Sequence, residues 1–144
     1  MRILFVCLGN ICRSPTAEAV VRHMSEGRLD VDSAGTERWN VGKAPYGPAI
    51  SAAAQRGYDL DGLRARQVAP ADFERYDLIV AMDEENVADI EAIRPPGNQT
   101  PARLFLDFAP ETGRKAVPDP YYTRDFEEAL DLIEAASRGL LATV

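Results

Sequence analysis

The sequence predicts an α/β protein in which helices cover both faces of a central parallel sheet of about four strands, making three layers. Short, continuous apolar runs alternate along the chain with segments whose apolar residues recur at helical spacing. Capping residues, prolines and glycines mark the ends of the helical segments. The chain has 144 residues, of which 46% are hydrophobic, and this suits a single compact domain over residues 1–144.

Four segments have the composition of buried strands. The first contains the unbroken apolar run Ile3-Leu4-Phe5-Val6, which is typical of a strand buried on both faces. Gly35 follows the second strand and ends it. The four predicted strands span residues 2–7, 29–34, 76–82 and 103–106.

Four further segments have helical periodicity and recognisable ends. Ser14 is expected to cap the first helix, with Pro15 at its first helical position. Gly57 ends the second helix, and Asp83 is interpreted as the cap of the third. The predicted helices run from residue 15 to about 24, from 49 to 56, from 84 to about 93, and from 126 to 141. The segment 117–122 is predicted to be an exposed loop.

Composition and charge argue against several classes of function. The 16 Lys and Arg residues against 23 Asp and Glu give a net charge of −7, so no nucleic-acid partner is expected. No apolar run approaches the roughly 18 residues of a transmembrane helix, so no membrane partner is expected either. The amino-terminal apolar run is too short for a signal peptide. This favours a cytoplasmic protein, with export by another route left open.

The cysteines and the lone histidine do not form a metal site by their number or spacing. Cys7, Cys12 and His23 are too few for a zinc centre, so neither a metal nor another cofactor is expected. His23 is therefore interpreted as a surface residue. A structural disulfide is not expected in a reducing compartment. Reactivity is the remaining reason to consider the two thiols.

The loop between the first strand and the first helix, residues 7–14, has the features of an anion site. Ligands of parallel α/β sheets bind beyond the carboxyl ends of the strands. A short loop that enters a helix can turn successive N–H groups inward, and the helix adds partial positive charge. Gly9 and Asn10 are expected to supply the left-handed backbone that such a turn needs. The loop therefore predicts a phosphate or another oxyanion as ligand.

Cys7 and Arg13 supply the chemistry in this loop. The Arg13 guanidinium can bind two phosphoryl oxygens at once. The helix dipole, the loop amides and this cation would lower the pKa of the Cys7 thiol, and Ser14 could donate a hydrogen bond to its sulfur. A thiolate below a bound phosphoryl group is a nucleophile. The alternative is that Cys7 is a small buried hydrophobe and Arg13 a solvated surface residue.

Phosphoryl transfer also needs an acid for the leaving oxygen. Asp119 lies between two prolines, which would hold its carboxyl group in place, although Asp and Pro are also common in ordinary turns. Tyr121 and Tyr122 could line a slot for an aromatic ring or simply pack. Trp39 lies in a Gly/Pro-rich loop, where recognition is favoured over a packing role.

The segment Val6–Pro15, with the sequence VCLGNICRSP, resembles the phosphate loop of the low-molecular-weight protein tyrosine phosphatases. Further segments of the family follow in the same order, so the resemblance covers essentially the whole chain. These segments are Asp32–Thr36, Trp39–Gly42, Ala65–Gln67, Ala81–Asp83 and Asp119–Tyr122.

The resemblance implies a role for each matched position. Cys7 would form a phosphocysteine, Arg13 would bind the phosphoryl oxygens, and Asp119 would protonate the departing tyrosine and then activate water. Ser14 and Ser33 would support the loop, and Cys12 would trap oxidised Cys7 as a disulfide. The substrate-binding residues that follow from the loop and the resemblance together are Leu8, Gly9, Asn10, Ile11, Cys12, Ser14, Trp39, Asn40, Tyr121 and Tyr122. Phosphotyrosine-containing proteins are the implied substrates, and a tyrosine kinase is one candidate partner.

Two departures from the family pattern bear on efficiency. Leu63 stands where many members carry a histidine that supports Asn10 and Ser14, and Tyr46-Gly47-Pro48 replaces an Asp-Pro-Arg segment. These departures are the only support for a non-catalytic phosphotyrosine-binding module. A thiol-linked arsenate reductase is a further alternative, but that chemistry needs cysteines beyond Cys12, and there are none.

Overall fold

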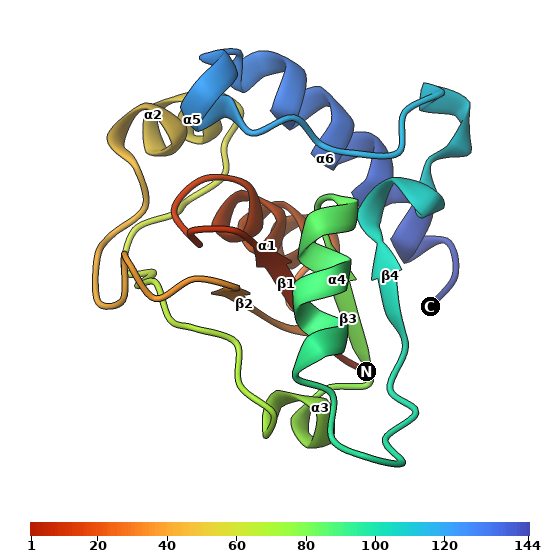
Figure 1. The fold of residues 1–144 in the computed structure, drawn as a ribbon. Coiled ribbons are helices and arrows are strands. Elements are labelled where there is room, and N and C mark those ends of the chain that lie inside the picture. Colours follow the sequence, from red (N-terminus) through yellow and green to blue (C-terminus); the bar gives the residue numbers. More distant parts are fainter.

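Strand β1 (Arg2–Cys7) lies inside a four-stranded sheet because its residues are apolar on both faces (Figure 1). The computed structural model describes all of residues 1–144, and the strand order is β2-β1-β3-β4. Strand β1 pairs with β2 (Asp30–Gly35) on one side and with β3 (Leu78–Ala81) on the other, and β4 (Ala102–Leu104) is an edge strand. All three pairings are parallel, so the four carboxyl ends lie at one end of the sheet.

Alternate residues of β1 point into two different cores. The helices are α1 (Arg13–Met24), α2 (Gly47–Gln55), α3 (Asp72–Arg75), α4 (Glu84–Ala92), α5 (Pro120–Thr123) and α6 (Phe126–Leu141), with 3-10 turns η1 (Phe105–Phe108) and η2 (Pro110–Thr112). Ile3 and Phe5 belong to the larger core, which α1, α2 and α6 cover. Leu4 and Val6 belong to the smaller core, to which α3 and α4 contribute. The predicted α/β class, with a parallel sheet between two helical layers, is confirmed.

The structure confirms the type of every predicted strand and helix, with small shifts at their ends. Helix α6 begins and ends at the predicted residues. Asp83 caps α4 as predicted, because its Oδ1 accepts the N–H of Asn86 at 2.8 Å. Strands β3 and β4 are shorter than predicted, and the chain after β4 tightens into η1 at Phe105. Helix α2 begins two residues early, at Gly47, because Pro48 suits a first helical turn.

Two predicted local features are wrong. Ser14 does not cap α1, which begins at Arg13 after Cys12; the Ser14 hydroxyl instead lies 3.0 Å from the Cys7 sulfur. The segment 117–122 is not an exposed loop, because Val117 is fully buried and the chain from residue 120 forms α5. Helix α3 and both 3-10 turns were not predicted, since they are too short to show a period.

The strand order changes direction at β1, and this places the site. The chain passes from β1 to its neighbour β2 and then crosses to β3 on the other side of β1. Ligands of open α/β sheets bind at such a point, beyond the carboxyl ends of the strands. The loop 8–12 leaves β1 there and enters α1, so the predicted phosphate loop occupies this position. No helix combines the length and the apolar character that crossing a membrane would require.

Candidate active site

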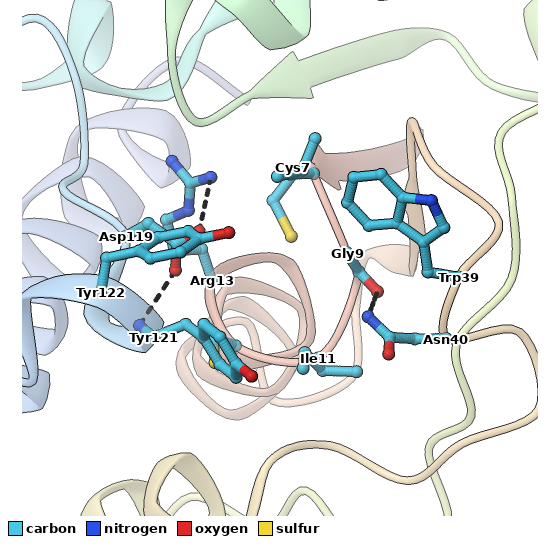
Figure 2. A pocket seen from close by; sticks show the side chains of 11 residues that line it. Cys7, Gly9, Ile11, Arg13, Trp39, Asn40, Asp119, Tyr121 and Tyr122 are labelled. Carbon is cyan, nitrogen blue, oxygen red and sulfur yellow. Dashed lines mark hydrogen bonds and ion pairs between the residues drawn. The ribbon is translucent and has the colours of Figure 1, made fainter.

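A cavity of about 200 Å³ opens at the carboxyl end of β1 (Figure 2). One wall is the loop that follows β1, a second comes from the segment before α2, and a third from α5. Its eleven lining residues are Cys7, Leu8, Gly9, Ile11, Cys12, Arg13, Trp39, Asn40, Asp119, Tyr121 and Tyr122. All eleven were predicted from the sequence as catalytic or substrate-binding residues. The other three predicted site residues, Asn10, Ser14 and Ser33, are buried close to this loop.

Cys7 ends β1 with its sulfur among hydrogen-bond donors. The side chain is buried, and its Sγ lies 3.0 Å from the Ser14 hydroxyl and accepts the N–H of Asn10 at 3.3 Å. The Ser14 oxygen also accepts a hydrogen bond from Asn10 Nδ2 at 2.7 Å, so its one proton can point to the Cys7 sulfur or, at 3.4 Å, to the carbonyl oxygen of Ala34. The Asn10 N–H and the Ser14 hydroxyl thus both lie within hydrogen-bond distance of the Cys7 sulfur.

Asn10 fixes the shape of the loop through a buried network. It is in the left-handed backbone region, with φ of 56°, as predicted. Its Oδ1 accepts the backbone N–H of Arg66 at 3.0 Å, and this contact orients the side-chain amide. Nδ2 donates to Ser14 and, at 3.1 Å, to Ser33, whose hydroxyl donates to Glu18 at 2.7 Å. The network thereby fixes the positions of Asn10 and Ser14 beside Cys7.

Glu18 ends this network and was not identified from the sequence. Its carboxyl group is buried and pairs with Arg22 four residues later on α1. Burial raises the pKa of Glu18 above its ordinary value, although hydrogen bonds from Ser33 and Arg22 act in the opposite direction. A carboxyl group on the buried side of α1 is the signal that could have revealed it, because such groups are rarely buried without a partner.

Arg13 is held so that part of its guanidinium remains without a protein partner. Its Nη1 donates to Asp83 Oδ2 at 2.7 Å and to the carbonyl oxygen of Val117 at 2.9 Å. Nη2 lies 3.5 Å from Asp119, and the buried Nε has no hydrogen-bond partner. A buried donor without a partner is unfavourable unless a ligand accepts from it. The Nε and Nη2 side of the fork therefore suits two oxygens of an anion.

Charges around Arg13 keep it protonated. Burial alone would lower its pKa, but the negative charges of Cys7, Asp83 and Asp119, with the Asp83 hydrogen bond, raise the pKa above its ordinary value. Asp83 was predicted to cap a helix and belongs to one of the segments of the family resemblance, and the structure gives it the further role of an ion-pair partner for Arg13. Its position directly after β3 could have indicated it, because β3 ends beside β1.

Asp119 lies across the cavity from Trp39 (Figure 2). It caps α5, because its Oδ1 accepts the N–H of Tyr121 at 3.0 Å. Its Oδ2 is the oxygen near Arg13 Nη2. The side chain is about one quarter exposed, so the carboxyl group has a partner at each oxygen and still borders the cavity.

The outer walls of the cavity are aromatic and open to solvent. Trp39 is 65% exposed and Tyr122 is 71% exposed, so neither plugs the core. Asn40 Nδ2 donates to the carbonyl oxygen of Gly9 at 3.2 Å and ties the Trp39 segment to the loop. The predicted left-handed backbone at Gly9 is wrong, since Gly9 is not among the residues with positive φ. A Cβ at this position would lie 2.8 Å from Asn40 Nδ2, so a larger residue would require the Asn40 side chain to move.

Cys12 is a free, buried thiol beside the same cavity. Burial, followed by the negative charges of Asp119 and Cys7, raises the pKa of Cys12 to about 12. It is therefore a neutral thiol at physiological pH. Cys7 is also free, and a disulfide between the two stays a prediction.

The two departures from the family pattern have local explanations. Leu63 packs against the larger core, and Asn10 finds its hydrogen-bond partners without it. Tyr46 accepts a hydrogen bond from Arg124 at 2.6 Å. Arg66 forms ion pairs with Asp72 and Asp32. His23 is exposed, as predicted.

Comparison with known proteins agrees with this geometry. The family model described as low molecular weight phosphotyrosine protein phosphatase matches residues 2–144. A low molecular weight protein-tyrosine-phosphatase of Streptomyces coelicolor is 44% identical over 153 residues, covering 99% of this chain and 93% of that protein. YfkJ of Bacillus subtilis, also named a low molecular weight protein-tyrosine-phosphatase, is 40% identical over 147 residues, covering 99% and 94%.

Solved structures agree as well. The crystal structure of YfkJ superimposes with a TM-score of 0.94 at 39% identity, over 99% of this chain and 93% of that one. A crystal structure of a protein tyrosine phosphatase from Entamoeba histolytica with Hepes in the active site gives a TM-score of 0.92 at 35% identity, over 99% and 96%. The match over nearly the whole length and the shared fold together show that the chain belongs to the low molecular weight protein tyrosine phosphatase family.

Proposed function

We propose that this chain hydrolyses phosphotyrosine and other aryl phosphates through a phosphocysteine intermediate on Cys7. One observation carries the proposal: Cys7, Arg13 and Asp119 line a single cavity. They would supply a nucleophile, an oxyanion binder and a proton donor around the same space. Phosphoryl transfer needs these three functions and their relative placement.

In the first step the phosphoryl oxygens accept hydrogen bonds from the loop amides and from Arg13. The Cys7 sulfur attacks phosphorus in line with the leaving oxygen, so an S–P bond forms as the P–O bond to tyrosine breaks. Protonated Asp119 gives its proton to that oxygen, and tyrosine departs as a neutral phenol.

In the second step water hydrolyses the phosphocysteine. Asp119, now a carboxylate, takes a proton from the water as the oxygen attacks phosphorus. The S–P bond breaks and its electron pair returns to sulfur. The Ser14 hydroxyl and the Asn10 N–H support this leaving thiolate, since both lie within hydrogen-bond distance of Sγ. Inorganic phosphate is released.

The walls of the cavity favour an aromatic phosphate ester as substrate. Trp39, Tyr121 and Tyr122 present exposed ring surface at the entrance. Aromatic rings stack on such surfaces, and a phosphotyrosine side chain offers one ring with a phosphate at its end. The Hepes found in the active site of the Entamoeba histolytica relative carries a sulfonate, whose three oxygens resemble those of a phosphoryl group.

The two alternative functions have less support. Thiol-linked arsenate reduction needs a further cysteine to pass oxidation on, and Cys7 and Cys12 are the only cysteines of the chain. A silent phosphotyrosine-binding module drew support from Leu63 and the 46–48 segment. The hydrogen bonds of Asn10 do not require Leu63, which removes the first argument.

The test compares the wild-type protein with Cys7→Ser in p-nitrophenyl phosphate hydrolysis, with a metal chelator present throughout. We expect the substitution to lower kcat by about 10⁴-fold or more, because it removes the nucleophile. A phosphoenzyme should be recovered by acid quench from Asp119→Ala, in which hydrolysis of the intermediate is slow. Equal activity of wild type and Cys7→Ser would overturn the proposal. Arsenite formation coupled to thioredoxin would establish the reductase instead.

A further inference from the structure

The segment that carries Asp119 is attached to the rest of the molecule at few points. Val117, just before it, is fixed, since its N–H donates to the carbonyl oxygen of Met82 at 2.9 Å and its own carbonyl accepts from Arg13. Between residues 118 and 125, only Pro120 is buried. Apart from buried Pro120 and the 3.5 Å ion pair between Asp119 and Arg13, the position of α5 therefore depends on contacts made by exposed side chains.

Arg124, directly after α5, makes three of these contacts. Its Nη1 donates to the hydroxyl oxygen of Tyr46 at 2.6 Å. Its guanidinium carbon lies 5.6 Å from the ring centroids of both Tyr46 and Tyr121, which are 5.1 Å from each other. A hydrogen bond and two cation–π contacts thus join three side chains, which we call the clasp: Tyr46, Tyr121 and Arg124.

The other side of the clasp is anchored to the phosphate loop. The backbone N–H of Tyr46 donates to the carbonyl oxygen of Ile11 at 2.8 Å. The Tyr46 ring also stacks on Phe126, the first residue of α6, with 6.2 Å between centroids. The clasp therefore connects the loop that holds Cys7 to the short helix that holds Asp119.

The backbone at Arg124 supports a role for its side chain. Arg124 has φ of 64°, in the left-handed region, and its N–H closes α5 on the carbonyl oxygen of Pro120 at 2.9 Å. Glycine is the usual residue at such a helix end, and a side chain with a Cβ costs free energy there. An arginine in this conformation indicates that its contacts offset the cost.

We propose that Tyr46 and Arg124 are positioning residues for Asp119, holding α5 so that its carboxyl group reaches the leaving oxygen of the substrate. This proposal rests on the function proposed above. General acid catalysis contributes about 10²- to 10⁴-fold to a rate, and a misplacement of about 1 Å can cost about 10²-fold. Loss of the clasp should therefore remove part of the contribution of Asp119 without affecting phosphate binding.

The kinetic test varies the need for a proton donor. Phenyl phosphate releases a weakly acidic phenol and needs the acid, whereas 2,4-dinitrophenyl phosphate releases a much more acidic one and does not. For Arg124→Gly, which keeps the left-handed backbone without strain, we expect kcat/KM to fall about tenfold with phenyl phosphate and less than about twofold with the dinitrophenyl ester. Tyr46→Phe keeps the ring but loses the hydrogen-bond acceptor. It should lower kcat/KM less than Arg124→Gly does, and again more with phenyl phosphate than with the dinitrophenyl ester.

Two controls separate positioning from a general effect. Arg103 lies on β4, outside the cavity, and its guanidinium also stacks on an aromatic ring, that of Phe108. Arg103→Ala should leave the rates with both substrates unchanged. In an Asp119→Ala background, Arg124→Gly should cause less than about a twofold further loss with phenyl phosphate, because the group that it positions is gone. Equal losses with both substrates, or additive losses in the double variant, would overturn the proposal.

A second measurement does not depend on activity. The N–H groups of Tyr122 and Thr123 donate to the Asp119 carbonyl oxygen at 3.0 and 3.1 Å. Their hydrogen exchange should be several-fold faster in Tyr46→Phe than in the wild type or Arg103→Ala, because α5 opens more often. Unchanged exchange in an active enzyme would refute the clasp and leave the proposed function standing. If exchange is faster in Tyr46→Phe but the wild-type protein has no phosphatase activity, the proposed function is refuted and the attachment of α5 by the clasp is not.

Discussion

Asn10 holds the phosphate loop in a conformation that costs free energy. Its φ of 56° is unusual for a residue with a side chain, and three hydrogen bonds from its amide group offset that cost. The same arrangement places the Asn10 N–H and the Ser14 hydroxyl within hydrogen-bond distance of the Cys7 sulfur. A single residue thus couples the backbone shape of the loop to the surroundings of this sulfur.

Two substitutions at this position should separate the two contributions of Asn10. Asn10→Gly relieves the backbone and loses the amide, whereas Asn10→Ala loses the amide and keeps the strain. We expect Asn10→Gly to be the more stable of the two by about 1 kcal/mol in urea unfolding, while both lose activity to a similar degree. Equal stability of the two variants would show that the left-handed backbone is not a cost here.

Arg13 depends on the planar fork of its guanidinium. Arg13→Lys retains the charge but cannot bind Asp83, Val117 and two ligand oxygens together. We expect kcat/KM for p-nitrophenyl phosphate to fall about 10²- to 10³-fold, in line with the loss of a preorganised oxyanion donor. Arg103→Lys is the matched control and should retain full activity. A loss below tenfold at Arg13 would contradict the bidentate role.

Cys12 makes stability depend on pH in the alkaline range. Burial and nearby charges raise its pKa from 9.0 to about 12, so the folded state holds the proton more tightly than the unfolded state. The resulting stabilisation is complete below about pH 9 and is lost as pH rises toward 12. Cys12→Ala should therefore be less destabilising at about pH 11 than at about pH 7, by roughly 2 kcal/mol. A penalty that stays constant over this range in urea unfolding would contradict the raised pKa.

At the scale of elements, the end of β2 supports the phosphate loop by lying against it. Gly35, the last residue of β2, pairs with Cys7 in the sheet. A Cβ on Gly35 would lie 2.8 Å from the carbonyl oxygen of Leu8 and 3.1 Å from the Cβ of Asn10. Both neighbours belong to the loop, and one of the atoms is backbone. The strand can approach this closely only because residue 35 has no side chain.

Gly35→Ala should therefore displace the loop. We expect a destabilisation of about 1–3 kcal/mol and a loss of activity of at least about tenfold, since the clash is with backbone. Gly47→Ala is the matched control, because nothing lies within 4 Å of a Cβ there and its φ is not left-handed. If both variants behave alike in thermal unfolding and in p-nitrophenyl phosphate hydrolysis, the close approach is not a constraint.

At the scale of the whole molecule, we expect this negatively charged protein to bind an anion through local structure. The net charge is −7, yet the cavity gathers loop amides, the start of α1 and the buried Arg13. If phosphate binds the native cavity and not the unfolded chain, it should stabilise the fold by about 2.7 kcal/mol at 100 times its dissociation constant. For a chain of this size that corresponds to a rise in Tm of roughly 5–10 °C.

The control for this prediction is sodium chloride at equal ionic strength, which should leave Tm nearly unchanged. Arg13→Lys should reduce the phosphate effect sharply, because the fork that accepts two oxygens is lost. A rise in Tm that is the same in wild type and in Arg13→Lys would place phosphate elsewhere on the surface.

Much of this arrangement could be predicted from the sequence, for identifiable reasons. The apolar run of β1 and the strong periodicity of α6 are local signals, and both elements were predicted at their observed ends. The anion loop was predictable because Cys7, Arg13 and the helix start lie within one short segment. The contact of Asp83 with Arg13 and that of Glu18 with Ser33 were not predicted, because each joins residues that are distant in the sequence. Ser14 was misassigned as a cap because the competing partner, the Cys7 sulfur, becomes visible only when the loop is folded.

The order of elements along the chain has a consequence for synthesis in the cell. Cys7 emerges from the ribosome near the start, but Asp119 and its helix α5 emerge near the end. Strand β1 must also wait for β3, more than 70 residues later, before both of its edges are paired. A nascent chain therefore exposes its thiol long before it can turn over a phosphate ester, and catalytic competence arrives only with the last part of the protein to be translated.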